Sequence, residues 1–193
     1  MSMQNVEPFD GLQTLGDIAR VHARLRPDTM ALKFEGRTTT YGVLDAHTNR
    51  VAQALLADGT KKADRIGYLA KNSDRFFEIL LGAAKIGAVT LPIGWRLAAA
   101  EIAYLLENGE VSILFVGKEF GDLAREAIAI SGRQVRVIDL ESERPGGYAA
   151  WRDSQDATDP AVAISAADTA LQTLHLGHNR PAQGRHADQP QPS

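Results

Sequence analysis

The sequence predicts an α/β protein with an open, doubly wound, mostly parallel sheet, helices on both of its faces, and an N-terminal β-hairpin. Two observations support this. Between residues 64 and 140, apolar segments of four to seven residues alternate with amphipathic segments of ten or more. Such alternation is typical of parallel βαβ units. Between residues 30 and 41, polar and apolar residues alternate around a Glu-Gly pair, which is typical of a hairpin turn.

The first two elements are a helix and the hairpin. Thr14 stands three residues before Asp17, an arrangement related to a capping box, and the apolar residues of segment 14–25 fall on one helical face. The hairpin covers residues 30–41 and turns at Glu35 and the glycine after it. A second helix then begins at Tyr41.

That second helix has a signal at each end. Thr40 is its expected N-cap, and the helix ends near Asp58, where Gly59 can adopt the left-handed conformation that often follows a helix.

The alternating region follows. Ser73 is the expected N-cap of its first helix. The expected strands are 64–70, 88–93, 112–116 and 134–140, and the expected helices are 74–86, 98–108 and 119–131. After residue 141 the pattern weakens to loops, a short helix at 148–152 and the start of one more strand at 168–172.

Composition narrows the function. The chain has 193 residues, is 44% hydrophobic and 23% charged, and has a net charge of -3, values that suit one or two globular domains. The absence of cysteine excludes disulfides, thiolate metal sites and a cysteine nucleophile. It is compatible with a reducing compartment, and we expect a cytoplasmic location by default. No stretch reaches the roughly 18 apolar residues of a membrane span. Scattered Lys and Arg give no nucleic-acid footprint, so we expect a small-molecule or protein partner.

Common catalytic motifs are missing from the body of the chain. There is no G-x-G-x-x-G after a strand, no G-x-x-x-x-G-K-[ST] and no G-x-S-x-G. The loop 70–74 leads into a helix whose free N–H groups could hold an anion, but Ser73 is better interpreted as a cap. His22 and His47 lie on helix faces and are interpreted as packed or solvated, and the acidic residues as scattered helix surface charges.

One pair in the body is a candidate for ligand contact. Trp95 and Arg96 follow the end of a strand and precede a helix, so they could line a ligand site. The alternative is a packed Trp with Arg stacked on it. We predict no catalytic residue and no metal ligand in the body.

Two segments resemble a known family. "TTTYGVLDAHTNRVAQALLADG" (38–59) resembles the opening of the AMP-forming acyl-CoA synthetases, the superfamily that includes luciferases and peptide-synthetase adenylation domains. The stretch 64–116 is similar to their next block, "GAxKxGAVxxPxNxRLxxxEIxYxL". The resemblance covers about residues 12–172, with Gly94 standing where many members carry Asn.

The last stretch, "TLHLGHNRPAQGRHADQP" (173–190), holds three of the five histidines: His175, His178 and His186. It could be a metal-binding tail, although no helical pattern orients the histidines and no carboxylate or thiolate pattern accompanies them. In the family a strand like 168–172 leads directly into the phosphate-binding loop, "LYTSGTTGLPKGVMLTNH" or a close variant. This chain has the histidine-containing stretch there instead.

The genetic code relates the two stretches. Codons can be chosen for residues 173–190 such that reading one base later gives L-Y-T-S-G-T-T-G-L-P-K-G-V-M-L-T-N. The wobble bases are free, but the second base of each tail codon is fixed by its residue and must supply the first base of the family codon, and it does so throughout. We therefore expect one extra base, or two missing bases, near codon 173, with residues 173–193 translated out of frame.

The resemblance implies a reaction for an intact relative: a long- or medium-chain fatty acid, or another carboxylic acid, reacts with Mg-ATP to an acyl-adenylate, and the acyl group passes to the thiol of CoA. The family's phosphate loop, adenine motif, ribose-binding Asp and catalytic Lys would lie downstream of Gln172 or out of frame. We therefore expect an inactive fragment that needs no cofactor of its own, whereas the family uses Mg²⁺, ATP and CoA.

These expectations divide the chain into a flexible N-terminus (1–11), a partial AMP-binding-type domain (12–172) and a disordered tail (173–193). Core surface left exposed would favour self-association. Two alternatives stay open. One is a non-catalytic interaction module that binds a partner or an intact paralogue. The other is frameshifting during translation that restores a full-length enzyme.

Overall fold

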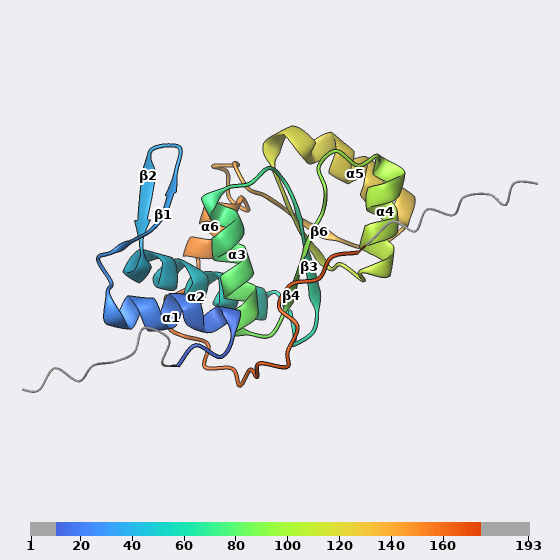
Figure 1. Cartoon of the computed structure of the whole chain (residues 1–193). Helices are drawn as coiled ribbons and strands as arrows, with labels where there is room; N and C mark the ends of the chain where they lie inside the picture. Colours follow the sequence, from blue (N-terminus) through green and yellow to red (C-terminus); the bar gives the residue numbers. More distant parts are fainter. Residues whose placement is uncertain (1–10, 175–193) are drawn as a thin grey trace, which may run out of the picture.

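The structure, a computed structural model, describes residues 11–174 (Figure 1). Its centre is a four-stranded parallel sheet in the order β4-β3-β5-β6. The strands are β3 (Arg65–Leu69), β4 (Val89–Pro92), β5 (Ile113–Val116) and β6 (Arg136–Asp139). The predicted fold class is therefore confirmed.

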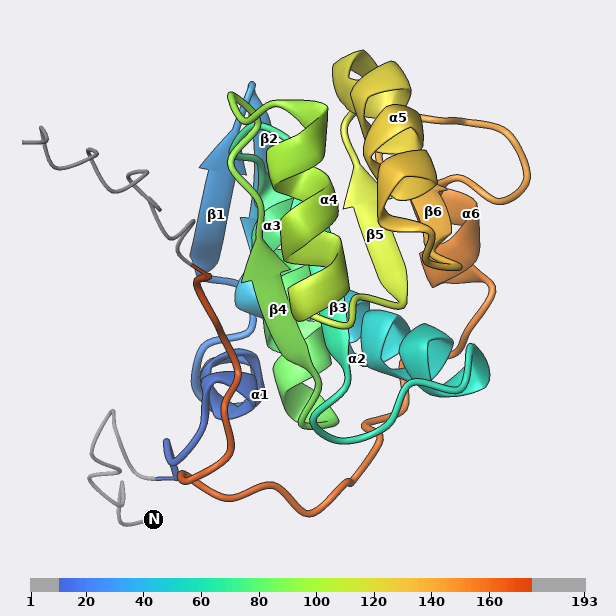
Figure 2. The ribbon, with the colours of Figure 1, turned by 90° about the vertical axis from the view of Figure 1, so that its right-hand side faces the viewer.

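Helices cover both faces of this sheet (Figure 2). One face carries α2 (Tyr41–Ala57), α3 (Asp74–Lys85) and α6 (Tyr148–Asp153), and α1 (Leu15–Leu25) packs against α2 and α3. The other face carries α4 (Ala99–Asn108) and α5 (Gly121–Ser131). The predicted helix 119–131 is divided, because a 3₁₀ turn, η1 (Lys118–Phe120), precedes α5.

The sequence of β5 is a continuous apolar run because both faces of this strand are covered by helices. Ile113 and Phe115 point into the core on the α2/α3 side, whereas Leu114 and Val116 point into the core on the α4/α5 side. All four are at most 4% exposed. A strand covered on both faces needs apolar residues at every position.

The hairpin and the N-cap of α2 match the sequence prediction. Strands β1 (Met30–Phe34) and β2 (Arg37–Thr40) pair antiparallel. Glu35 and Gly36 both have positive φ, 47° and 81°, as a primed two-residue turn requires. The hydroxyl of Thr40 accepts a hydrogen bond from the Val43 N–H at 3.4 Å.

The predicted strand 168–172 is not formed as a regular strand. A single parallel bridge joins Thr90 of β4 to Leu171. The Thr90 N–H donates to the Ala170 carbonyl at 2.9 Å, and the Gln172 N–H donates to the Thr90 carbonyl at 3.0 Å. This stretch therefore forms strand-like pairing only at Leu171, where it contacts the edge strand β4.

Helices α2 and α3 approach closely at Gly82. A Cβ at this position would lie 2.7 Å from Cβ of Val51 and 2.8 Å from the Thr48 carbonyl oxygen. We expect Gly82→Ala to lower the free energy of unfolding by about 1–3 kcal/mol, because the two helices would have to separate. Urea unfolding measures this change.

The matched control is Gly121→Ala, since Gly121 has helical dihedral angles and no neighbouring atom within 4 Å of an added Cβ. Its expected effect is neutral, or stabilising by up to about 1 kcal/mol. Equal stability of the Gly82 variant and the control would contradict the close-packing argument.

Some predictions concern residues outside the described part of the chain. These are the flexible N-terminus up to residue 10 and the tail from His175 onward, including His178 and His186. Among residues 11–174, no helix is both long and apolar enough to cross a membrane.

Candidate functional site

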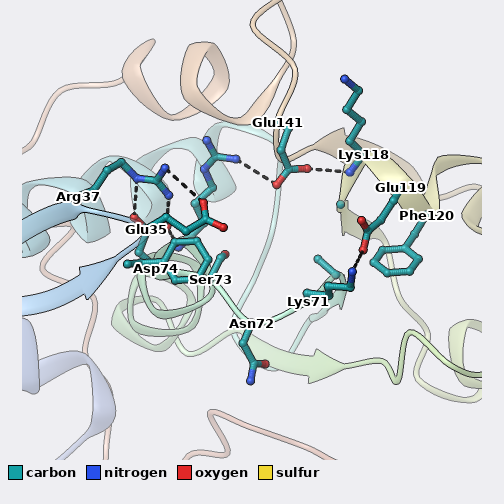
Figure 3. A pocket seen from close by; sticks show the side chains of 14 residues that line it. Glu35, Arg37, Lys71, Asn72, Ser73, Asp74, Lys118, Glu119, Phe120 and Glu141 are labelled. Carbon is teal, nitrogen blue, oxygen red and sulfur yellow. Dashed lines mark hydrogen bonds and ion pairs between the residues drawn. The ribbon is translucent and has the colours of Figure 1, made fainter.

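The candidate site lies where the carboxyl ends of the parallel strands meet. The chain leaves β3 toward one face of the sheet, whereas it leaves β4 and β5 toward the other. Open α/β sheets bind ligands at such a topological switch point. A pocket of about 590 Å³ lies there (Figure 3).

The pocket wall has contributions from four parts of the chain. The loop after β3 and the start of α3 supply residues 70–75, the loop after β5 and η1 supply residues 117–120, and the segment after β6 supplies Glu141. The hairpin supplies Phe34, Glu35 and Arg37. The hairpin is thus part of the site, although its sequence signals only a turn.

Charged side chains on the wall pair with one another. Nε and Nη2 of Arg37 lie 3.2 and 3.0 Å from the two carboxylate oxygens of Asp74. On another side of the pocket, Nζ of Lys71 lies 2.9 Å from Glu119. Figure 3 places these two pairs apart, across the opening. The pairs leave a surface of mixed charge.

Glu141 joins the loops after β5 and β6. Its carboxylate accepts a hydrogen bond from the Lys118 backbone N–H at 2.7 Å, and Nη1 of Arg75 lies 3.3 Å from its other oxygen. The same Arg75 nitrogen donates to the Leu140 carbonyl. These contacts fix the geometry of the wall, and the residues that line the pocket include no histidine for acid–base chemistry.

Ser73 occupies the N-cap position of α3, but the prediction that its side chain caps the helix is wrong. No cap hydrogen bond forms, and Oγ of Ser73 lies 3.0 Å from the Tyr68 hydroxyl instead. The Tyr68 hydroxyl donates to the Lys71 carbonyl at 3.1 Å, and burial raises the pKa of Tyr68. The Ser73 hydroxyl therefore bonds to the buried tyrosine and not to the helix N-terminus. The sequence around Ser73 does not reveal this competition.

Trp95 and Arg96 lie beside the pocket and are not on its wall. The Arg96 guanidinium carbon is 3.8 Å from the centre of the Trp95 ring, so the stacked arrangement is the one observed. The Trp95 ring also lies 5.9 Å from Phe120 and 5.5 Å from Nζ of Lys71, and both of these residues line the pocket. A role of Trp95 and Arg96 in ligand contact stays a prediction.

The two body histidines lie apart. His22 packs against Tyr41 with ring centres 4.7 Å apart, and burial, followed by the charge of Arg26, lowers the pKa of His22. His47 belongs to a buried polar cluster, with Nδ1 2.8 Å from Oε1 of Glu78.

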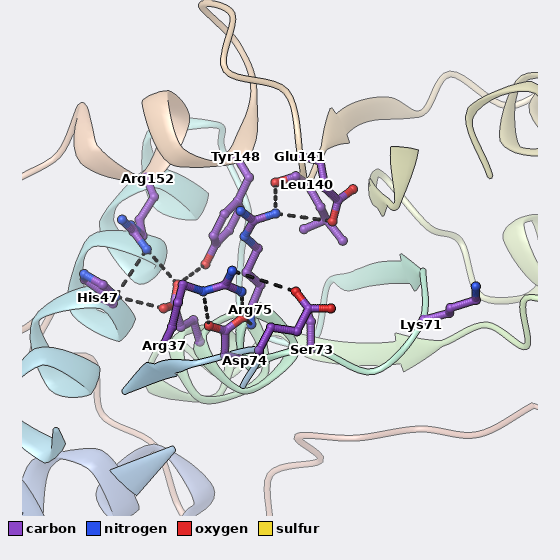
Figure 4. A network of polar contacts seen from close by, with 12 residues as sticks. Arg37, His47, Lys71, Ser73, Asp74, Arg75, Leu140, Glu141, Tyr148 and Arg152 are labelled. Carbon is purple, nitrogen blue, oxygen red and sulfur yellow. Dashed lines mark hydrogen bonds and ion pairs between the residues drawn. The ribbon is translucent and has the colours of Figure 1, made fainter. Parts of the chain in front are cut away.

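This cluster joins α2, α3 and α6 (Figure 4). Oε2 of Glu78 accepts hydrogen bonds from the Tyr148 hydroxyl and from Nη1 of Arg152, both at 2.8 Å. Glu78 is 4% exposed and Tyr148 is 1% exposed. The interpretation of acidic residues as surface charges is therefore wrong at Glu78.

Sequence reasoning missed Glu78 and also Lys85, whose side chain is fully buried. One signal was available, because each stands inside an apolar run, "FFEILL" and "GAAKIGAV". A charged residue in such a run is either at a helix surface or buried with partners. Only the positions of the partners distinguish these cases. Among residues 11–174, no group of three or more His, Cys, Asp and Glu side chains is arranged to hold a metal ion.

Comparisons with known proteins give a consistent result. The family described as AMP-binding enzyme matches residues 19–183. The fatty acid–[acyl-carrier-protein] ligase ScoC of Streptomyces coeruleorubidus is 38% identical over 164 residues, which make up 85% of this chain and 30% of ScoC. The chain therefore spans about a third of this curated relative.

Solved structures agree. A fatty acyl CoA synthetase of Mycobacterium tuberculosis superposes with a TM-score of 0.77 at 29% identity, covering 89% of this chain and 34% of that one. The N-terminal domain of FACL13 from the same organism gives a TM-score of 0.74 at 30% identity, covering 83% and 40%. The similarity thus extends over the sheet and the helices on both of its faces.

Proposed function

The chain belongs to the AMP-binding enzyme family, and from this premise we propose that it forms the first part of the N-terminal domain of a ligase that activates a fatty acid. The observation that carries the proposal is the family match over residues 19–183. The preference for a fatty acid is supported by the names of ScoC and of the mycobacterial synthetase.

The reaction proposed for the whole enzyme has two steps. A carboxylic acid reacts with Mg-ATP to give an acyl-adenylate and pyrophosphate, and the acyl group then passes to a thiol. The thiol belongs to CoA or, by analogy with the name of ScoC, to an acyl carrier protein. Cytosolic location is part of the proposal, because the sequence contains no cysteine.

The described residues do not fit Mg-ATP. Lys71, Arg37 and Arg75 on the pocket wall already have carboxylate partners at 2.9, 3.0 and 3.3 Å, and residues 11–174 contain no group of three or more His, Cys, Asp and Glu side chains arranged to hold a metal ion. We therefore derive no step of ATP chemistry from this chain and propose that the 193-residue polypeptide does not activate acids by itself.

We expect no ATP–pyrophosphate exchange when the purified chain is assayed with a panel of medium- and long-chain fatty acids. The physical reason is that Arg37, Lys71 and Arg75 on the pocket wall are already paired with carboxylates, and that the family's preorganised phosphate loop would lie beyond Gln172 or out of frame. The fatty acyl CoA synthetase of Mycobacterium tuberculosis serves as the positive control. Acid-dependent exchange above background would overturn the proposal of inactivity and leave family membership untouched.

The proposal includes the change of frame near codon 173. The family match extends to residue 183, ten residues past that codon, so residues 173–183 have a second interpretation as a diverged phosphate loop in the original frame. Coding DNA distinguishes the two. If the frame changes near codon 173, the coding DNA downstream encodes the remaining family motifs in the reading frame that begins one base later. If they follow in the original frame, the frame hypothesis fails.

A second candidate function is a non-catalytic interaction module. It is favoured by apolar side chains at the two sheet edges, since Val137 on β6 is 47% exposed and Leu171 beside β4 is 43% exposed. Unprotected edges promote association. Sedimentation of the full chain tests this: a monomer at all concentrations would contradict association through these edges.

A further inference from the structure

Residues 155–172, which we name the strap, connect α6 to the sheet edge. The strap runs along the layer of α1, α2 and α3 and then turns up beside β4 (Figure 1). Thr173 and the rest of the chain follow from its end. The position of the strap therefore decides where the next part of the chain begins.

Asp159 is the charged anchor of the strap. Its carboxylate oxygens lie 2.5 Å from Nε and 3.0 Å from Nη2 of Arg20 on α1. Nζ of Lys85, at the end of α3, lies 3.8 Å from the same carboxylate. Two cations from two helices thus converge on one strap residue.

Helix α2 holds the strap next to this anchor through side-chain amides. Nδ2 of Asn49 donates to the Ala157 carbonyl at 3.0 Å, and Nε2 of Gln53 donates to the Thr158 carbonyl at 3.0 Å. The anchored part of the strap is therefore bonded to all three helices.

Lys85 is the most deeply placed member of the network. Its side chain is fully buried, and Nζ lies 2.5 Å from Oδ1 of Asp45 and 2.5 Å from Oδ1 of Asn49. Helix α1 covers it, since a Cβ at Gly16 would lie 3.1 Å from Cα of Lys85. A buried ammonium group is costly unless carboxylate and carbonyl oxygens surround it. Lys85 also orients Asn49, which in turn holds the strap.

Apolar packing holds the strap only in part: Val162 packs against the core, whereas the residues after it border a cavity. A cavity of about 490 Å³ lies between strap residues 164–171, the start of α1 and the end of α3. The remaining ion pair, Lys62 with Asp168 at 2.7 Å, has a half-exposed lysine, and exposed pairs contribute little. Asp159 is itself 35% exposed, but of the ion pairs that hold the strap only those at Asp159 include a fully buried group, the Lys85 ammonium. We therefore take Asp159 as the main charged constraint on the path of the strap.

We propose that Lys85 is a positioning residue that holds the strap through Asp159 and Asn49 and so sets where residues 170–172 join the sheet edge at Thr90. In the proposed function residues 170–172 lead toward the phosphate-binding loop, so the functional importance of this positioning rests on the proposed function. The placement of the strap itself can be tested in this chain without any enzymatic activity.

Amide hydrogen exchange on the full chain provides the test. The N–H groups of Thr90 and Gln172 form the two backbone hydrogen bonds between the strap and β4. The Gln172 side chain also accepts a hydrogen bond from Nε of Arg65 on β3 at 3.1 Å. In Lys85→Met we expect both amides to exchange roughly tenfold faster or more, while amides within β3 and β5 keep their protection relative to global unfolding. Arg125→Met is the control, because Arg125 pairs with Asp122 on the exposed surface of α5.

Asp159→Asn is the second variant. This substitution keeps the shape of the Asp159 side chain, removes its charge and leaves the helix interiors unchanged. It therefore tests the proposal even if Lys85→Met does not fold. We expect the same selective loss of protection at Thr90 and Gln172. Unchanged exchange at both amides in Asp159→Asn, or an equal acceleration of all amides, would overturn the proposal. Neither outcome depends on the pyrophosphate exchange assay, so a failure of the strap proposal can be distinguished from a failure of the proposed function.

Discussion

Replacing Glu78 with alanine is expected to lower the free energy of unfolding by about 3–5 kcal/mol. The carboxylate accepts hydrogen bonds from Tyr148 and Arg152 and lies 2.8 Å from His47. Its removal leaves the Arg152 cation, whose side chain is 14% exposed, without its buried partner. Urea unfolding followed by circular dichroism measures the loss.

Glu107→Ala is the matched control, since Glu107 is an exposed helical glutamate on α4. Its expected effect is within about 0.5 kcal/mol. A loss below about 1 kcal/mol in Glu78→Ala would mean that the cluster is not a buried ion network in solution.

The same carboxylate makes stability depend on pH. Burial by itself would raise the pKa of Glu78, but the hydrogen bond and charge of His47, followed by Arg152 and Tyr148, outweigh it and lower the pKa from 4.5 to about 2. Because the pKa is lower in the folded state, the stabilisation is complete above pH 4.5 and is lost as the pH falls toward 2. We expect a loss of about 3 kcal/mol from this group. Glu78→Gln should lack this component, and an identical pH dependence in both proteins would contradict it.

Phe115→Ala is expected to destabilise the protein by about 3–5 kcal/mol. Phe115 is fully buried in β5, and its ring centre lies 5.3 Å from that of Trp151 and 6.1 Å from that of Tyr148. Truncation removes this aromatic contact and leaves a cavity between the sheet and α6. The change in urea midpoint, with an unchanged slope, measures the effect.

Two further variants serve as controls for Phe115→Ala. Val137→Ala changes a half-exposed side chain on the neighbouring strand and should cost less than about 1 kcal/mol. Phe115→Leu keeps most of the volume and should fall between the two. An equal loss for Phe115→Ala and Val137→Ala would show that α6 does not close this face in solution.

Local chemistry made most of the elements predictable. Thr40, the positive-φ pair at Glu35 and Gly36, and the apolar periods each act over a few residues, so they can be recognised in one dimension. The strand 168–172 was only partly predictable, because its pairing with Thr90 depends on the path of the strap. The position of the pocket follows from the strand order, which the structure supplies, and its wall includes Arg37, which the hairpin brings in from a distant part of the sequence.

The sequence by itself determined the α/β class, the order of its elements and the family resemblance, because periodicity, caps and motifs are local properties. Only the tertiary structure decided which charges are buried. From the sequence alone, Glu78 is interpreted as a helix surface charge and Lys85 is not singled out. In the structure α6 brings Tyr148 and Arg152 to Glu78, and α2 and the strap bring Asp45, Asn49 and Asp159 to Lys85. A buried charge is stable only with its partners in place, and that condition depends on segments that are remote in the chain.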